Sequence, residues 1–465
     1  MKKKVWRGIL VFALCVCIAV TGVLLYEKQQ RLRDRSEMLE ELERNIGQYD
    51  EQSIVLHETS RQKAQELAQM YGAQLRITAD GRFATLTLPE GTTIRDIYAM
   101  DESLQYIDEM AADYQVKVSE LTEEEGQEEQ ERLPQRPKYT VTDADYELQT
   151  YLDYLNMGAV WDLYTGSGIT VAIIDTGIDT DHPEFAGRIS EYSYNATEDK
   201  IVKDYQLPNG GYDWSLVEDE QGHGTAVAGV LGASMNTGNV VGVAPDVNLL
   251  VIKAECDEYG TFARVSDLIF GLFYAVERDV QVVNMSFGIA APENPFEEAV
   301  RLSYDSDIIC VAAAGNDATA ALTWPAADEH VIGVGALDGW QMAVYSNYGD
   351  NVDIMAPGST YTTVMGGGYG IKNGTSLAAP LVAGAVALHM NHNIWTTFDQ
   401  VAEILYASCY DLDVPGRDWY YGFGALDISA FVMEDRGKIT YDMLTDEVDD
   451  VDGVFIRNHT LQQLP

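Results

Sequence analysis

Cysteine and basic residues are both scarce in this chain of 465 residues, and each scarcity excludes a class of protein. The five cysteines are too few and too scattered for the disulfide framework of a small secreted domain, so we predict free thiols. Only 30 lysines and arginines stand against 74 aspartates and glutamates, which gives a formal net charge of −44. Because nucleic-acid binding requires basic groups that neutralise phosphates, we predict no nucleic-acid partner.

One long run without charge stands at the amino terminus. Residues 8–26 are 19 uncharged residues that follow a basic segment, residues 1–7. A helix of this length can cross a bilayer, and no good small-x-small cleavage site follows it. We therefore predict an uncleaved anchor over residues 1–26, with the membrane as a partner. Basic residues lie on both sides of the run, so the positive-inside rule does not decide its orientation.

The next part of the sequence shows a charged segment and then a small mixed domain. Residues 27–50 predict a solvated juxtamembrane helix. Residues 51–121 predict an α+β unit of βαββαβ order. Its expected elements are a strand at 53–57, a helix at 60–71, a hairpin of 74–78 and 82–88, a helix at 93–114 and a strand at 116–118.

Two acidic segments frame the largest part of the chain. Residues 122–145 begin with six glutamates among residues 123–131, and we predict a disordered linker, because such a segment buries too little apolar surface to fold. Residues 431–465 predict a solvated or loosely docked tail.

Between these segments, residues 146–430 alternate between strand-like and helix-like patterns. Apolar strand-like runs occur at 169–174, 248–252, 280–285, 308–313 and 331–335, and helix-like runs at 225–233, 262–277, 292–304, 376–390 and 397–408. This alternation predicts an α/β fold, with a parallel sheet covered by helices on both faces.

Three reactive side chains stand at the ends of these expected elements. A buried strand ends in Asp175, and the carboxyl ends of parallel strands are where sites lie in open α/β sheets. His223 stands between two glycines at the start of a helix of small residues. Ser376 precedes an alanine-rich helix, whose free N–H groups favour negative charge. Taken alone, the histidine has an ordinary structural interpretation, and the serine is also a common helix cap.

These segments together resemble the subtilisin-like serine proteases, the subtilase family. The matching motifs are Ile174–Gly177, Gly222–Thr225 and Gly374–Pro380, in the chain order Asp, His, Ser of subtilisin. A fourth segment, Ala312–Asn316, resembles the one that carries the family's oxyanion-hole asparagine. The resemblance covers roughly residues 146–430.

The resemblance implies a subtilisin-like fold and serine endopeptidase activity through an acyl-enzyme. His223 is then expected to take the proton from Ser376, while Asp175 orients the imidazole. The Asn316 amide and the backbone N–H of Ser376 are expected to bind the oxyanion. None of these steps requires a cofactor.

The resemblance also places a polypeptide substrate between two segments that follow buried strands. One segment holds Ser286, Phe287 and Gly288, and the other holds Ala313, Ala314 and Gly315. Extended backbone in these segments is suited to pair with an extended peptide.

A structural calcium ion is a further expectation from the resemblance. Glu184 and Asn236 fall where the family often places ligands, and Gln149 offers a third oxygen. Oxygen ligands from loops suit calcium. A plain surface loop accounts for the same residues equally well, and the sequence leaves both interpretations open.

Taken together, the sequence predicts a membrane-anchored serine endopeptidase made as a zymogen. Residues 51–121 resemble the inhibitory pro-domains that precede subtilase catalytic domains, and the family is mostly secreted, which predicts a single-pass membrane protein with its catalytic domain outside the cell. The alternative is a catalytically silent subtilase fold that serves as a binding or signalling module. An inactive scaffold would usually have lost a triad residue, and this chain retains all three.

Overall fold

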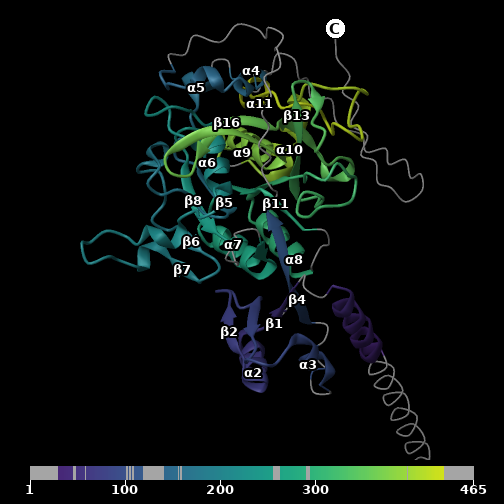
Figure 1. The fold of residues 1–465 in the computed structure, drawn as a ribbon. Helices are drawn as coiled ribbons and strands as arrows, with labels where there is room; N and C mark the ends of the chain where they lie inside the picture. Colours follow the sequence, from purple (N-terminus) through teal and green to yellow (C-terminus); the bar gives the residue numbers. More distant parts are fainter. Residues whose placement is uncertain are drawn as a thin grey trace, which may run out of the picture. The chain divides into compact units, whose positions relative to one another are not determined.

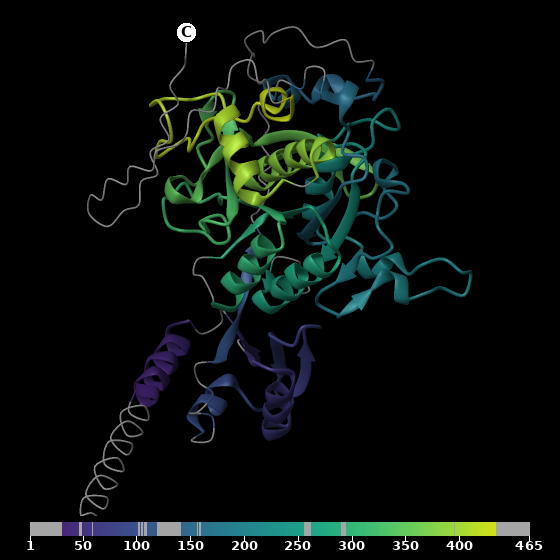
Figure 2. The ribbon, with the colours of Figure 1, turned by 180° about the vertical axis from the view of Figure 1, so that it is seen from behind.

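The chain folds into two units, which are divided between Gln115 and Val116. This computed structural model describes residues 30–433, except for 46–48, 58, 101–102, 104–105, 107–108, 119–140, 156, 158–159, 255–261, 290–293 and 395. Figures 1 and 2 show the elements of each unit from opposite sides.

The first unit is built on an antiparallel sheet. Its elements are β1 (Tyr49–Leu56), α2 (Arg61–Tyr71), β2 (Gln74–Ile77), β3 (Ala84–Thr87), α3 (Ile94–Ala99) and most of β4 (Met110–Val118), whose last residues, Val116–Val118, belong to the second unit. The strands pair in the order β4-β1-β3-β2. Leu56, Leu67, Leu86 and Ile97 are buried together in its core.

The predicted helix at 93–114 is wrong over its second half. The helix α3 ends at Ala99, and residues from Met110 onward belong to the strand β4. Met110 and Ala111 pair with Leu56 and Val55 of β1. This long-range pairing overrides the helical tendency of the alanines, because propensity is a weak prior beside tertiary context.

The charged segment before β1 is helical over residues 30–44, but its end is not solvated. Leu42 is fully buried in the core of the first unit. The Tyr49 hydroxyl and the Arg95 guanidinium both donate to the Leu42 carbonyl, each at 3.2 Å. These two hydrogen bonds hold the end of the helix against the unit.

The second unit contains a mainly parallel sheet. Its strands are β5 (Thr170–Asp175), β6 (Tyr194–Asn195), β7 (Lys200–Ile201), β8 (Asn248–Lys253), β10 (Val282–Met285), β12 (Ile309–Ala313), β13 (Val331–Asp338), β14 (Gln341–Met342) and β15 (Ile354–Pro357). They pair in the order β14-β13-β12-β10-β5-β8-β6-β7, and β15 joins β13. The central pairs are all parallel, as the alternating pattern predicted.

Helices cover both faces of this sheet. The helices are α4 (Tyr151–Tyr154), α5 (Val160–Leu163), α6 (His223–Gly232), α7 (Val265–Glu277), α8 (Asn294–Asp305), α9 (Thr375–His392), α10 (Phe398–Ser408) and α11 (Ile428–Met433). Helices α6 and α9 lie on one face, and α7 and α8 lie on the other (Figures 1 and 2). The helix predicted at 262–277 begins at Val265 in the structure, because Phe262–Arg264 form the short strand β9.

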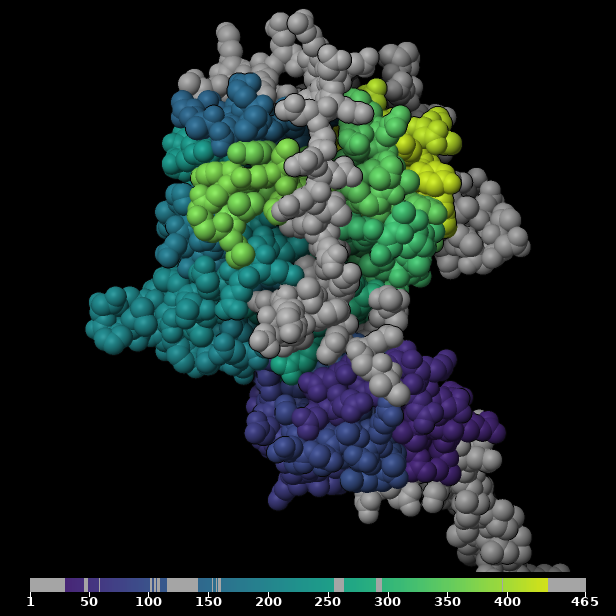
Figure 3. All heavy atoms as spheres, in the orientation of Figure 1, coloured from purple at the N-terminus to yellow at the C-terminus, as the bar shows by residue number. Residues whose placement is uncertain are grey.

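A hairpin of β16 (Ser359–Val364) and β17 (Gly368–Asn373) leads directly into α9. It lies on the surface of the second unit, as the light-green atoms in Figure 3 show. Behind it, α9 is buried along residues 375–390 and is apolar on every side, as expected for a core helix.

The prediction of a single-pass membrane protein is corrected by the structure. Within the part of the chain that the structure describes, no helix has both the length and the apolar character needed to cross a bilayer. The 18-residue helix α9 packs inside the second unit and is part of its core. The uncharged run at 8–26, which prompted the prediction, lies outside the described residues.

The structure also corrects the predicted end of the acidic linker and the predicted start of the acidic tail. The structure describes residues from 141 onward, and Asp143 is buried, so the end of the predicted linker belongs to the fold. At the other end, Phe431 and Val432 are buried in the core of the second unit. The remainder of the predicted tail, residues 434–465, lies outside the described residues.

Two cysteines fall within the described residues, and both are free, as predicted. Cys310 lies in the buried strand β12, where desolvation raises the pKa of its thiol to about 12. A thiol with such a pKa stays protonated and unreactive near neutral pH.

Candidate active site

Asp175 and His223 form a buried pair where β5 ends and α6 begins. The His223 Nδ1 atom lies 2.6 Å from Asp175 Oδ1, and both side chains are almost fully buried. Gly224 permits this approach, since a Cβ atom there would stand 2.2 Å from the Gly177 carbonyl oxygen. The Thr176 N–H also donates to Asp175 Oδ1, at 2.8 Å, and fixes the carboxylate.

This pairing selects one tautomer of the imidazole. A carboxylate at Nδ1 keeps the proton of neutral histidine on that nitrogen, which leaves Nε2 as the acceptor. Among the described residues, His223 Nε2 is buried and has no hydrogen-bond partner. The ring is therefore held with its basic nitrogen available.

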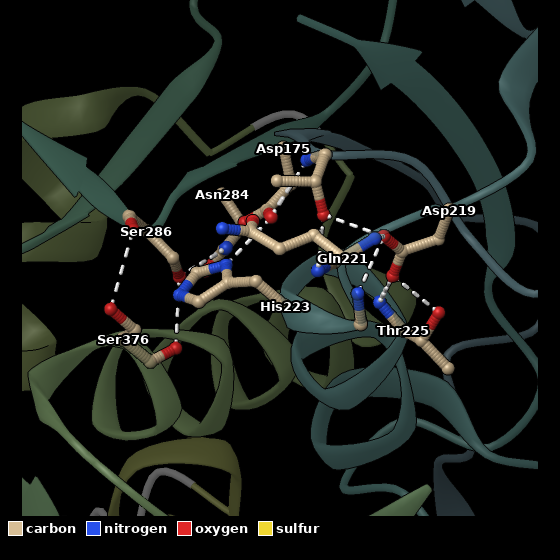
Figure 4. Close-up of polar contacts among 11 residues, drawn as sticks. Asp175, Asp219, Gln221, His223, Thr225, Asn284, Ser286 and Ser376 are labelled. Carbon is tan, nitrogen blue, oxygen red and sulfur yellow. Dashed lines mark hydrogen bonds and ion pairs between the residues drawn. The ribbon is translucent and has the colours of Figure 1, made fainter. Parts of the chain in front are cut away.

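A second aspartate, Asp219, shapes the turn that carries the histidine (Figure 4). Its carboxylate accepts hydrogen bonds from the N–H groups of Gln221, Gly222 and Thr225 and from the hydroxyls of Thr176 and Thr225, at 2.6–3.0 Å. Gly222, at the N-cap of α6, has no side chain to cap the helix. The sequence reasoning missed Asp219, whose only signal is an aspartate just before a helix start.

Ser376 lies in the first turn of α9 and is fully buried. Its Oγ donates to the Ser286 carbonyl at 3.3 Å, and Ser286 Oγ donates back to the Ser376 carbonyl at 2.9 Å. Asn284 Nδ2 donates to Ser286 Oγ at 3.0 Å and holds this pair from behind. Figure 4 shows the His223 ring on the same side of the site as the Ser376 side chain.

Asn316 follows β12 and points its amide toward the same helix start. Its Oδ1 accepts from the backbone N–H and the hydroxyl of Thr375, at 2.9 and 3.0 Å. The Gly315 N–H in turn donates to Thr375 Oγ1 at 3.1 Å. Because Oδ1 faces these donors, Nδ2 is the end that faces away, and it is buried without a partner among the described residues.

Both predicted substrate segments have buried side chains. Ala313 and Ala314 are core residues, packed in separate apolar clusters, so these two positions contribute backbone and not side chains. On the other segment, Phe287 is buried and contacts the ring of Phe296 edge to face.

Thr323 lies close to both Gly288 and Gly315, one glycine from each predicted substrate segment. A Cβ atom at Gly288 would lie 2.4 Å from the Thr323 methyl carbon, and one at Gly315 would lie 3.5 Å from its hydroxyl oxygen.

The edge of the first substrate segment carries an extended strand. Within the second unit, Phe287 and Gly288, which form β11, pair antiparallel with Val118 and Lys117 at the end of β4. The backbone beside Ser286 is thus able to hold an extended chain by main-chain hydrogen bonds, which is one established mode of peptide recognition.

The three predicted calcium ligands are brought to one loop, residues 234–241. Gln149 and Glu184 both accept hydrogen bonds from backbone N–H groups of this loop, and Asn236 is part of it. Within the described residues no cluster of three or more histidines, cysteines or acids is placed to hold a metal.

A parallel α/β sheet with an Asp–His pair at its carboxyl edge, beside a serine at the start of a buried helix, is the arrangement of one class of serine hydrolases. Residues 166–424 match the model of the Subtilase family, and the chain belongs to this family.

Relatives and a solved structure agree with this assignment. The chain is 38% identical over 249 residues to the intracellular serine protease of Paenibacillus polymyxa, covering 52% of this chain and 72% of that protein. It is 36% identical over 287 residues to the thermophilic serine proteinase of Bacillus sp. (strain AK1), covering 60% of this chain and 64% of that protein. Its fold resembles fervidolysin of Fervidobacterium pennivorans, a keratinolytic enzyme related to subtilisin, with a TM-score of 0.71 at 24% identity, covering 83% of this chain and 62% of that one.

Proposed function

We propose that this protein is a serine endopeptidase of the subtilisin type, which hydrolyses peptide bonds through Asp175, His223 and Ser376. The observation that carries the proposal is the buried 2.6 Å contact between His223 and Asp175, which leaves Nε2 as a base beside a serine at a helix start. Family membership supports it, as do the names of the relatives. A silent binding module would not need an imidazole held in this tautomer.

In the proposed reaction, the Ser376 hydroxyl turns from the Ser286 carbonyl toward His223 Nε2. Catalytic hydrogen bonds are often loose in the free enzyme and tighten when substrate binds. As Oγ attacks the scissile carbonyl, His223 takes its proton, and the negative charge on the carbonyl oxygen meets Asn316 Nδ2 and the Ser376 N–H. His223 then protonates the leaving amine, and water releases the acyl group from Ser376.

The direct test is covalent labelling of the serine. A fluorophosphonate probe reacts with a serine only where a neighbouring base activates it. We expect stoichiometric labelling of the wild-type protein at Ser376, located by peptide mass spectrometry, and none in Ser376→Ala. Ser286→Ala removes a neighbouring hydroxyl and serves as the matched control, which should still be labelled. Labelling that persists in Ser376→Ala would show that the nucleophile is a different residue.

We further propose that the first unit is an inhibitory pro-domain of the same chain. Its βαββαβ order supports this. Directly after the first unit, residues 117–118, which belong to the second unit, pair with the segment beside Ser286 as an extended chain. A tether of a few tens of residues raises the effective concentration of such a segment to about millimolar. The residues after β4 are then positioned to be cut by their own active site.

We predict a single intramolecular cut between Leu121 and Asp145. Purified wild-type chain should convert to a shorter form at a rate independent of protein concentration, and Ser376→Ala should remain full length. N-terminal sequencing of the product locates the cut. A rate that rises in proportion to concentration would contradict an intramolecular reaction, and processing of clean Ser376→Ala would point to another protease.

A further inference from the structure

The loop of residues 234–241 is held by two carboxylates through five consecutive backbone N–H groups. The first three belong to Asn236, Thr237 and Gly238, and all donate to Asp143, at 2.8, 3.2 and 3.2 Å. Asn236 has a φ of 58°, in the left-handed region, which turns the chain over this carboxylate. Asp143 is itself buried, with 6% of its surface exposed.

The next two N–H groups, of Asn239 and Val240, donate to Oε1 of Glu184 at 2.6 and 3.2 Å. The Tyr369 hydroxyl donates to the same oxygen at 3.0 Å. Glu184 is fully buried, and the loop lies directly on it, because a Cβ atom at Gly238 would stand 2.0 Å from Oε1. The backbone of the loop therefore occupies the space in front of this carboxylate.

The other two predicted ligands already have protein partners on their oxygens. Gln149 Oε1 accepts the Val241 N–H at 2.9 Å, and Gln149 Nε2 donates to the Val241 carbonyl at 2.9 Å. Asn236 Oδ1 accepts from the N–H and the hydroxyl of Thr142, at 2.6 and 2.9 Å. Neither side chain presents a free oxygen to a cation in this arrangement.

Two carbonyl groups in the middle of the loop are also directed to protein donors. The Gly238 carbonyl accepts from the Ala144 N–H at 3.3 Å, and the Asn239 carbonyl accepts from the Asp145 N–H at 2.8 Å. Calcium takes about six to eight oxygen ligands. Of the carboxylate oxygens of Asp143 and Glu184, only Glu184 Oε2 is buried without a partner among the described residues.

Because the loop directs its N–H groups toward the two carboxylates, it favours a negative charge at that place over a positive one. Successive backbone N–H groups that converge on one point make a concave site for an anion, not for a cation. Here the anions are the protein's own carboxylates. The predicted ligands come together, but their donor set does not fit a calcium ion.

We propose that Asp143 and Glu184 replace the metal ion in this chain, so that the loop of residues 234–241 is held without calcium. The segment Val141–Asp145 supplies one of the two carboxylates and three backbone N–H groups, those of Thr142, Ala144 and Asp145, which makes it part of the fold of the second unit. The proposal concerns folding, and it stands whether or not the proposed protease activity is confirmed.

Thermal unfolding of the full chain tests the proposal, in the Ser376→Ala background so that self-digestion does not intervene. We expect the same Tm in excess EGTA and in millimolar calcium. A calcium-dependent rise in Tm that Glu184→Gln abolishes would overturn the proposal. A rise that Glu184→Gln leaves unchanged would place the ion elsewhere and agree with it.

Two matched variants test the role of the carboxylates. Asp143→Asn removes a charge that accepts three loop N–H groups, and we expect it to lower the Tm in EGTA and in calcium alike. Asp145→Asn removes a charge of the same segment whose donors, within the described residues, are the side chains of Asn239 and Tyr361. Its Tm should fall much less. Equal Tm values for the two variants would show that the three N–H groups of Asn236, Thr237 and Gly238 do not depend on the charge of Asp143.

Discussion

Replacing His223 by alanine is expected to lower kcat about 10⁶-fold, the size of effect known for triad residues in subtilisin itself. The imidazole takes the proton from Ser376 and later gives it to the leaving amine, so both halves of the reaction lose their proton carrier. The residual rate would come from oxyanion stabilisation and substrate positioning. Because His223 makes no ground-state contact that the proposal requires for binding, KM should change little.

A second Asp–His pair offers the control for this variant. His330 Nδ1 lies 3.0 Å from Asp328 Oδ1, with both side chains partly exposed and no assigned part in the reaction. His330→Ala should keep the wild-type kcat on a casein or peptide substrate, measured beside His223→Ala at equal folded concentration. If the kcat of His223→Ala stays within tenfold of the wild-type value, His223 is not the residue that carries the proton in the reaction.

Local sequence patterns located the three candidate residues at element boundaries, and the resemblance of their motifs to one family gave each residue its expected role. Asp175 closes an apolar strand, and His223 and Ser376 open helices of small residues. Gly224 belongs to such a signature, since its missing side chain is what permits the approach to Gly177.

Supporting contacts could not be predicted in the same way. Asp219 holds Thr176, which lies 43 residues away, and Asn316 is oriented by Thr375, which lies 59 residues away. No local pattern encodes such a pair. The fold brings the partners together, and their roles become visible only when the hydrogen bonds are known.

The predicted calcium site shows a different limit. Its three residues do converge, but whether a loop turns N–H or carbonyl groups inward depends on what packs against it. Here that partner is the segment Val141–Asp145, whose Asp143 lies 93 residues before Asn236 of the loop and downstream of a run of glutamates that is typical of a linker. If Asp143 holds the loop, a maturation cut between Leu121 and Asp145 should fall before Val141, since a later cut would release that carboxylate.

Asn316→Ala is expected to lower kcat about 10²–10³-fold, or ~2.7–4 kcal/mol of transition-state stabilisation, with little change in KM. The reason lies in how the amide is held. Thr375 fixes Oδ1 with two hydrogen bonds, which leaves Nδ2 buried and pointed away from them. A donor held in this way gains its partner when charge develops on the substrate oxygen. Its removal should therefore raise the energy of the transition state and lower kcat, without weakening substrate binding.

The variant Asn316→Asp separates this role from a structural one. It keeps an oxygen for Thr375 and replaces the N–H donor by a second oxygen, so it should lose at least as much kcat as Asn316→Ala while keeping the wild-type Tm. Asn391→Ala is the matched control, since this asparagine lies near the other end of α9, where its side chain accepts from the Gly166 N–H and donates to the Ser167 carbonyl. Steady-state kinetics with a peptide substrate decide the matter, because a large rise in KM at unchanged kcat would mean that Asn316 positions the substrate and does not stabilise the oxyanion.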